Sequence, residues 1–190
     1  MSSRNAVTSV PIHPLLAARH STRALKPDVD VTDAQLQAML EAARWAPSAG
    51  NSQPSRFIVG RRGGDAFKKI LAALNPGNQG WAQHAAVLIV AVRVVANEKG
   101  PLTASAYDLG QAMAHLTVQV LAEGLSMRQM GGFKAEQIVT EFSLPDNLEP
   151  VAVAAIGAAG NPADLPDDLR RPDDSPRTRH ELADLVLHTD

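Results

Sequence analysis

The sequence predicts an α+β domain in which helices surround a β-sheet, and three observations lead to this prediction. Segments with the periodicity of amphipathic helices alternate along the chain with short apolar segments of strand character. Two of these short segments, 86–92 and 151–156, are almost uniformly apolar, which is typical of strands buried on both faces of a sheet. The composition, 45% hydrophobic and 20% charged over 190 residues, suits one globular domain with a single core.

The first third of the chain contains the clearest helix signal. Residues 1–13 show no periodicity and are expected to form an N-terminal arm, followed by a short helix over 14–25. Thr32 and Gln35 form the pattern of a capping box, which predicts a helix that begins at this point. Pro47 should end that helix, because proline cannot continue it.

The middle of the chain alternates strands and helices. Residues 57–59 predict a short strand that ends at Gly60, and Asp65 is expected to cap the next helix. Residues 75–80 have the composition of a loop, and the buried strand 86–92 follows.

The second half continues this alternation. A long helix is predicted over 104–123, with Gly124 as its end, and then a strand over 127–130. A short helix around 138–142 precedes the buried strand 151–156.

The last thirty residues differ in composition from the rest. Residues 161–176 hold four prolines and five aspartates, so we expect an extended excursion there, and then a final helix over about 179–187 in the C-terminal segment 177–190. No repeat and no second domain is visible, so residues 1–190 are predicted to form a single domain.

Composition excludes several functional classes. The chain has no cysteine, which rules out disulfides, thiol catalysis and thiolate metal sites, and no metal site is predicted. A net charge of −2 gives no support to nucleic-acid or anionic-membrane binding. The longest apolar run, 85–92, is far too short for a membrane span, and no secretory signal is visible. We therefore expect a cytoplasmic protein with neither a nucleic-acid nor a membrane partner.

Three separated clusters of polar residues are candidates for function. Residues 19–23 carry two guanidinium groups, an imidazole and two hydroxyls, and residues 46–54 form a turn-rich run with two side-chain amides. Arg177 and Arg179 flank a threonine near the C-terminus. Each cluster alone would be expected on a solvated surface. Together they supply what a phosphorylated, polar cofactor needs, because arginine binds phosphate bidentately while hydroxyls and amides bind ring edges.

The order of these motifs resembles the FMN-dependent nitroreductase family, over about residues 14–188. The motifs are Arg-x-Ser-x-Arg at 19–23, Ala-Ala-Arg-x-Ala-Pro-Ser-Ala-x-Asn-x-Gln-Pro at 42–54, Phe-Ile-Val at 57–59, the helix from Tyr107 to Leu125, Met-Gly-Gly-Phe at 130–133, Ala-Ile-Gly at 155–157 and Pro-Arg-Thr-Arg at 176–179.

The resemblance implies a nitroreductase-like fold, with helices around a mixed, mainly antiparallel sheet, and an intertwined homodimer with FMN at the subunit interface. It implies that the first and last clusters bind the phosphate and that the two side-chain amides contact the ribityl chain and the ring. A glycine turn would place a backbone N–H beside the hydride-accepting nitrogen. The loop 47–49 would cover the flavin bound mainly by the other subunit. The implied cofactor-binding residues are Arg19, His20, Ser21, Arg23, Pro47, Ser48, Ala49, Asn51, Gln53, Gly131, Gly132, Arg177 and Arg179.

Three positions are left open. Asn78 lies in a loosely aligned region and could be a further ring contact. Gly131 replaces an acidic residue that many relatives carry, which should spare flavin binding but could change substrate preference. Trp81 could line a pocket or belong to the core.

The resemblance implies an oxidoreductase that passes two electrons from NAD(P)H, by ping-pong turnover in one shared pocket, to an electron-poor small molecule such as a nitro compound or quinone. The cofactor would supply the chemistry, so no catalytic side chain is predicted. The alternatives are a flavin-binding protein without nicotinamide turnover, a binder that has lost the flavin, or another reaction of the same fold: flavin destruction, dehalogenation or heterocycle oxidation.

Overall fold

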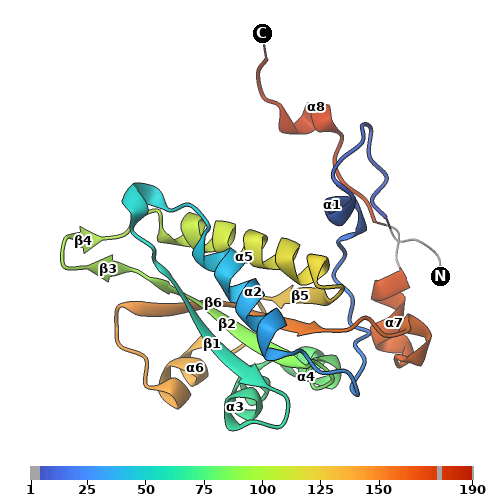
Figure 1. Ribbon diagram of the computed structural model, residues 1–190, viewed down its shortest axis with the longest axis horizontal. Helices are drawn as coiled ribbons and strands as arrows, with labels where there is room; N and C mark the ends of the chain where they lie inside the picture. The colour runs from blue at the N-terminus through green and yellow to red at the C-terminus, as the bar shows by residue number, and fades with distance from the viewer. Residues whose placement is uncertain (1–4, 175–176, 190) are drawn as a thin grey trace.

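The computed structural model describes residues 5–174 and 177–189, and its centre is a four-stranded sheet (Figure 1). The strand order is β1-β2-β6-β5, and every pairing in this sheet is antiparallel. A small hairpin of β3 and β4 extends from one end. The strands are β1 (Ser55–Arg61), β2 (Val87–Val94), β3 (Ala96–Asn97), β4 (Gly100–Pro101), β5 (Ser126–Met130) and β6 (Leu148–Gly157).

Helices cover both faces of the sheet, so the α+β prediction is confirmed. One core lies between the sheet and α2 with α5, and a second lies between the opposite face and α3, α4 and α6. The helices are α1 (Pro14–Ala18), α2 (Asp33–Arg44), α3 (Asp65–Ala73), α4 (Pro76–Ala82), α5 (Ser105–Ala122), α6 (Ala135–Phe142), α7 (Asp167–Asp174) and α8 (Leu182–Leu185), with 3₁₀ turns η1 (Ala49–Asn51) and η2 (Pro162–Asp164).

The two central strands are the ones that the apolar runs predict. The first six residues of β2 are fully buried, and β6 is buried over its last five. Side chains alternate between faces along a strand, so each of these strands contributes to both cores. Ile89 and Ile156 enter the α2–α5 core, whereas Leu88 and Val90 enter the other.

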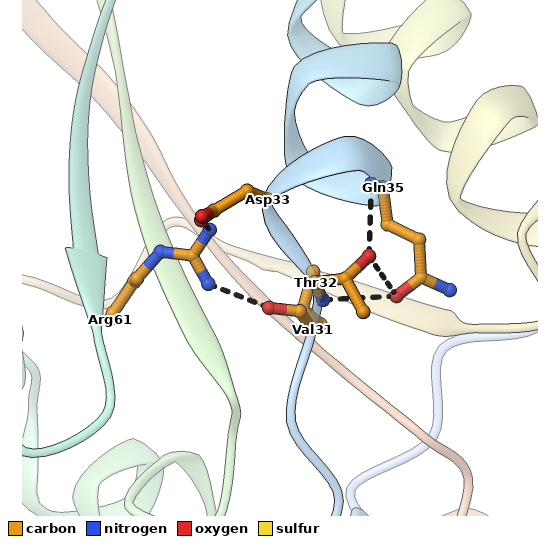
Figure 2. A network of polar contacts seen from close by, with 5 residues as sticks. All are labelled: Val31, Thr32, Asp33, Gln35 and Arg61. Atoms are coloured by element: carbon orange, nitrogen blue, oxygen red, sulfur yellow. Dashed lines mark hydrogen bonds and ion pairs between the residues drawn. The ribbon is translucent and has the colours of Figure 1, made fainter.

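The start of α2 forms as its sequence predicts. The Oγ1 atom of Thr32 accepts from the Gln35 N–H at 3.2 Å, and the Gln35 Oε1 accepts from the Thr32 N–H at 3.1 Å. Figure 2 shows Arg61 at the end of β1 donating to the Val31 carbonyl at 2.6 Å and pairing with Asp33. The capping box and this arginine together attach the beginning of α2 to the sheet.

The substitution Thr32→Ala is expected to lower the free energy of unfolding by about 1 kcal/mol, because it leaves helix N–H groups without their acceptor. Chemical denaturation measures this, with the exposed Thr8→Ala as the matched control. Equal stability of the two variants would contradict a stabilising cap.

The helix predicted over 14–25 is wrong in extent. α1 ends at Ala18, and Leu25 instead pairs with Ala159 in an isolated antiparallel bridge. The weak helix formers Ser21 and Thr22 explain the early end, because other hydrogen bonds replace helical ones there: the Thr22 hydroxyl accepts from the Ala24 N–H at 3.0 Å, and the Ser21 carbonyl accepts from Arg128.

Three predictions in the middle of the chain are also corrected. Residues 75–80 are not a loop: Pro76 occupies the first turn of α4, where its missing N–H costs nothing. Asp65 is the first residue of α3 rather than its cap, which is Gly64. Gly60 does not end β1 but lies within it, packed against the backbone of Phe67.

The C-terminal predictions are partly wrong. Residues 161–176 do not run as an extended excursion, since η2 and α7 form within them, while 175–176 lie outside the described residues. Pro166 precedes α7 and Asp167 and Asp168 occupy its first turn, where acidic groups favour the helix dipole. The final helix is only the four residues of α8.

None of the helices described in the structure combines the length and the apolar character needed to cross a bilayer.

Candidate functional site

The arginine cluster at 19–23 runs along the edge of the sheet beside β5. Arg128 on β5 donates to the Ser21 carbonyl, and the Arg19 guanidinium donates to the Ser21 hydroxyl at 3.2 Å. Arg23 donates to the Leu169 carbonyl at 3.3 Å, which joins the segment to α7. The structure therefore holds this cluster by tertiary contacts rather than on a helix.

The C-terminal segment returns to the same place. The Arg177 guanidinium donates to the carbonyls of Arg19 at 2.7 Å and Ala17 at 3.3 Å. Arg179 is exposed and donates to the carbonyl of Thr178 at 2.6 Å. The structure thus places Arg177 directly against the first cluster and gives no such contact to Arg179.

The glycine turn that follows β5 is tied to α4. The Gly132 carbonyl accepts from the Asn75 N–H and from the Asn78 side-chain amide, both at 3.0 Å. A Cβ on Gly132 would stand 3.0 Å from Asn78 Nδ2, so glycine permits this close approach. Gly131 is different, because a Cβ there would meet no atom within 4 Å.

Arg128 connects the glycine turn region with the arginine cluster. Its guanidinium carbon lies 5.6 Å from the ring centroid of Trp81, three residues after Asn78 on α4, while the same group reaches Ser21. Trp81 is fully buried and belongs to the core, which answers the question left open from the sequence. We call the resulting polar edge the β5 cradle; it comprises Arg19, His20, Ser21, Arg23, Asn78, Arg128, Gly131, Gly132 and Arg177.

The loop 46–53, which makes up most of the polar cluster at 46–54, has an unusual backbone. Gly50, Asn51 and Gln53 all have positive φ, at 56°, 54° and 48°. Ser48 stabilises the loop, because its hydroxyl accepts from the Gln53 N–H at 3.0 Å and its carbonyl accepts from the Asn51 N–H at 3.0 Å. Positive φ costs energy for residues other than glycine, so the surrounding contacts must hold this conformation.

Within one chain, the loop and the β5 cradle lie at opposite edges of the sheet. The loop enters β1 at Ser55, whereas the cradle adjoins β5, and these two strands are the opposite edges of the sheet. Three strand spacings of about 4.8 Å separate them by about 14 Å across the sheet. Figure 1 shows η1, within the loop, at the end of the molecule away from α1 and α7. The structure therefore does not bring all of the predicted site residues together within one chain.

A pocket of about 370 Å³ lies on the loop side of the sheet. Its wall is mostly apolar, with Leu40, Phe57 and Val59 among the lining residues. The charged residues in the lining are Arg44, Arg56 and Asp108. The volume falls within the range of about 300–1,000 Å³ found for small-molecule sites. None of the cradle residues lines it.

The end of α2, just before this loop, carries a compact charged cluster. Glu41 accepts from Arg44 at 2.6 and 2.7 Å and from the Trp45 indole N–H at 2.8 Å. The hydrogen bond from Arg44, then that from Trp45, lowers the pKa of Glu41 to about 2. Because the pKa of Glu41 in the folded protein lies below its ordinary value of 4.5, the ionised carboxylate stabilises the fold. This stabilisation is complete above pH 4.5 and is lost as the pH falls toward about 2.

We expect the Glu41 carboxyl to titrate with a midpoint of about 2 in a pH series of NMR spectra. The substitution Arg44→Gln should move that midpoint up toward 4.5, because it removes the larger cause of the lowered pKa. A wild-type midpoint near 4.5 would mean that the cluster does not persist in solution.

A sequence comparison identifies the family. The family model described as the nitroreductase family matches residues 16–158, most of the chain. The chain belongs to the nitroreductase family.

Individual relatives of this nitroreductase-family chain are similar to it over most of its length. An uncharacterised 15.4 kDa protein of Mycolicibacterium smegmatis is 33% identical over 140 residues, covering 70% of this chain and 94% of its own length. A crystal structure described as an oxidoreductase containing FMN is 31% identical, with a TM-score of 0.92 over 100% of this chain and 98% of its own. A nitroreductase family protein from Clostridium difficile 630 is 26% identical, with a TM-score of 0.70 over 90% of this chain and 94% of its own.

Two polar residues that contact the candidate site segments are absent from the sequence-based prediction. Arg128 lies on a predicted strand, and no sequence signal pairs it with Ser21 or Trp81 far away in the chain. Asp108 is buried on α5 yet accepts hydrogen bonds from Ala49 and Ser52 of the loop. A carboxylate on the buried face of an amphipathic helix is the signal that could have identified Asp108.

Proposed function

We propose that this nitroreductase-family protein is an FMN-dependent oxidoreductase that uses NAD(P)H, in ping-pong turnover, to reduce an electron-poor acceptor such as a nitro compound or quinone. The observation that supports the proposal most is the β5 cradle, where segments from both ends of the chain meet beside a glycine turn. When bound, FMN would supply the two-electron chemistry, and the protein would bind and orient it.

The cationic part of the cradle suits the phosphate of FMN. Arg19 and Arg177 are neighbours, because the Arg177 guanidinium reaches the Arg19 carbonyl at 2.7 Å, and Ser21 adds a hydroxyl. Guanidinium groups bind phosphate through two parallel hydrogen bonds, and a hydroxyl can complete the set. His20, Arg23 and the exposed Arg179 remain proposed contributors to the same region.

The other part of the cradle suits a flat polar ring. Around Gly131 no side chain or backbone atom lies where a Cβ would project, so a planar group can approach the turn closely. Asn78 is fixed by its bond to the Gly132 carbonyl and is partly exposed, so it can present an amide edge to the ring. We propose that backbone N–H groups of Gly131 and Gly132 face the hydride-accepting nitrogen.

A homodimer would complete the site. The loop and the cradle of one chain adjoin opposite edges of the sheet. We propose that the loop residues Pro47, Ser48, Ala49, Asn51 and Gln53 cover the flavin held by the partner. The outer face of α5 supports dimerisation, since Tyr107 is 72% exposed and Val118 38% exposed on a helix whose other face is core. Apolar side chains of α8, among them Leu182 and Leu185, are exposed as well.

The descriptions of two relatives support FMN as the cofactor and NAD(P)H as the electron donor. The structure with a TM-score of 0.92 is described as an oxidoreductase containing FMN. A Streptomyces griseus relative, 28% identical over 162 residues that cover 73% of this chain and 81% of its own, is provisionally named an NADH dehydrogenase/NAD(P)H nitroreductase.

The visible absorbance spectrum of the purified protein tests the proposal. We expect flavin bands that bleach when NADPH or NADH is added without oxygen and that return when a nitro compound or quinone follows. Flavin bands that persist with both nucleotides would instead indicate a flavin-binding protein without nicotinamide turnover. A colourless protein that does not bind added FMN would refute the proposed function.

A further inference from the structure

Asp108 is a buried acidic residue whose role the proposed cofactor site does not explain. It is only 3% exposed and lies in the first turn of α5. No salt bridge joins it to a lysine or arginine of the described residues. Burying a carboxylate is costly unless hydrogen bonds compensate, so its partners should reveal its role.

Those partners all belong to the loop 46–53. The Ala49 N–H donates to both carboxylate oxygens, at 3.1 and 3.2 Å, and the Ser52 hydroxyl donates to Oδ2 at 3.5 Å. The N-terminal position on α5 adds the favourable helix dipole. Asp108 therefore attaches the loop to the rigid helix of the core.

The backbone of the loop requires such an attachment. Ala49 and Ser52 flank Gly50 and Asn51, which are two of the three loop residues with positive φ. A chain in this conformation relaxes to other conformations unless contacts at both ends hold it. The carboxylate of Asp108 reaches the residues on both sides of the strained pair, so it holds the conformation of the loop.

We propose that Asp108 is a positioning residue that acts in trans: by holding the loop of its own chain, it sets FMN binding and turnover in the cradle of the partner subunit. This inference rests on the proposed function, because it requires FMN in the β5 cradle and the loop of the other chain above it. In this role Asp108, which lines the pocket beside the loop, acts through the loop that it holds.

The test uses mixed dimers of two differently tagged chains. One chain carries Asp108→Asn, which keeps the size of the side chain but replaces one accepting oxygen by an amide. The other carries Arg19→Ala with Arg177→Ala, which disables its cradle but leaves its loop intact. In the mixed dimer the single working cradle belongs to the Asp108→Asn chain and lies under the intact loop of the partner.

We expect the Asp108→Asn homodimer to bind FMN about tenfold more weakly and to show a raised KM for the acceptor, because a charge-assisted hydrogen bond is lost. The one working site of the mixed dimer should regain the wild-type dissociation constant and half of the wild-type kcat per dimer. A mixed dimer as weak as the Asp108→Asn homodimer would overturn the inference, since Asp108 would then act only within its own chain.

Two further variants complete the design. Asp65→Asn is the matched control, because Asp65 is an exposed acid in the first turn of α3, on the other face of the sheet. If the Asp108→Asn homodimer fails to fold, Ser52→Ala replaces it, with an expected loss of about twofold that the mixed dimer should also restore. An undiminished affinity in both Asp108→Asn and Ser52→Ala would overturn the inference. A wild-type protein that binds no FMN would instead refute the proposed function itself.

Discussion

Replacing Gly60 by alanine is expected to lower the free energy of unfolding by about 3 kcal/mol, the upper end of the usual cost of overpacking. The Cβ added at Gly60 would lie 2.5 Å from the Phe67 nitrogen and 2.6 Å from its Cα, and 2.9 Å from the Ala66 carbonyl carbon. These are backbone atoms of α3, so a rotamer change cannot relieve the overlap. The helix itself would have to move away from β1.

Chemical denaturation of Gly60→Ala measures this loss, with Gly77→Ala as the control. A Cβ at Gly77 would meet nothing within 4 Å, and alanine is the better helix former, so that variant should be unchanged or more stable by about 0.5–1 kcal/mol. If Gly60→Ala were as stable as Gly77→Ala, α3 would not pack on β1 as described.

Replacing Arg177 by alanine is expected to weaken FMN binding by about 1.5–3 kcal/mol, or roughly 10- to 150-fold. The substitution removes a positive charge from the proposed phosphate site. It also removes the hydrogen bonds to the Arg19 and Ala17 carbonyls that hold the arginine cluster in place. Arg19→Ala should have an effect of similar size.

Titration of the apoprotein with FMN, followed by flavin fluorescence, measures these affinities. Lys68→Ala is the charge-matched control, because Lys68 is exposed on α3 and makes only a 3.4 Å contact with Asp65. Arg179→Ala should cost less than Arg177→Ala, since Arg179 makes no contact with the cluster in the described residues. Unchanged affinity in both Arg19→Ala and Arg177→Ala would refute the phosphate assignment.

The elements that could be predicted from sequence are those whose signals are local. The capping box of Thr32 and Gln35, the apolar run of β2 and the end of α5 at Gly124 depend on residues a few positions apart. The error in the first predicted helix occurred where distant contacts outweigh local preference. Residues 19–23 leave the helix because β5 and the C-terminal segment bind them.

For the candidate site, the residue types were predictable but their grouping was not. The arginines, amides and glycines suited a phosphorylated planar cofactor, and the family match at 16–158 spans all of them except Arg177 and Arg179. Their separation into a cradle beside β5 and a loop beside β1 depends on the strand order, which no short segment encodes. Asp108 and Arg128 were missed because their partners lie 59 and 107 residues away.

The sequence by itself determined the α+β class, the two buried strands, most helix positions and the resemblance to a family, because hydrophobic period, caps and motif order lie along the chain. Only the tertiary structure decided that Arg177 meets the arginine cluster, that Gly60 permits α3 to pack on β1, and that the cradle and the loop lie at opposite edges of one sheet. These are contacts between segments distant in sequence, and their geometry follows from the packing of helices on the sheet.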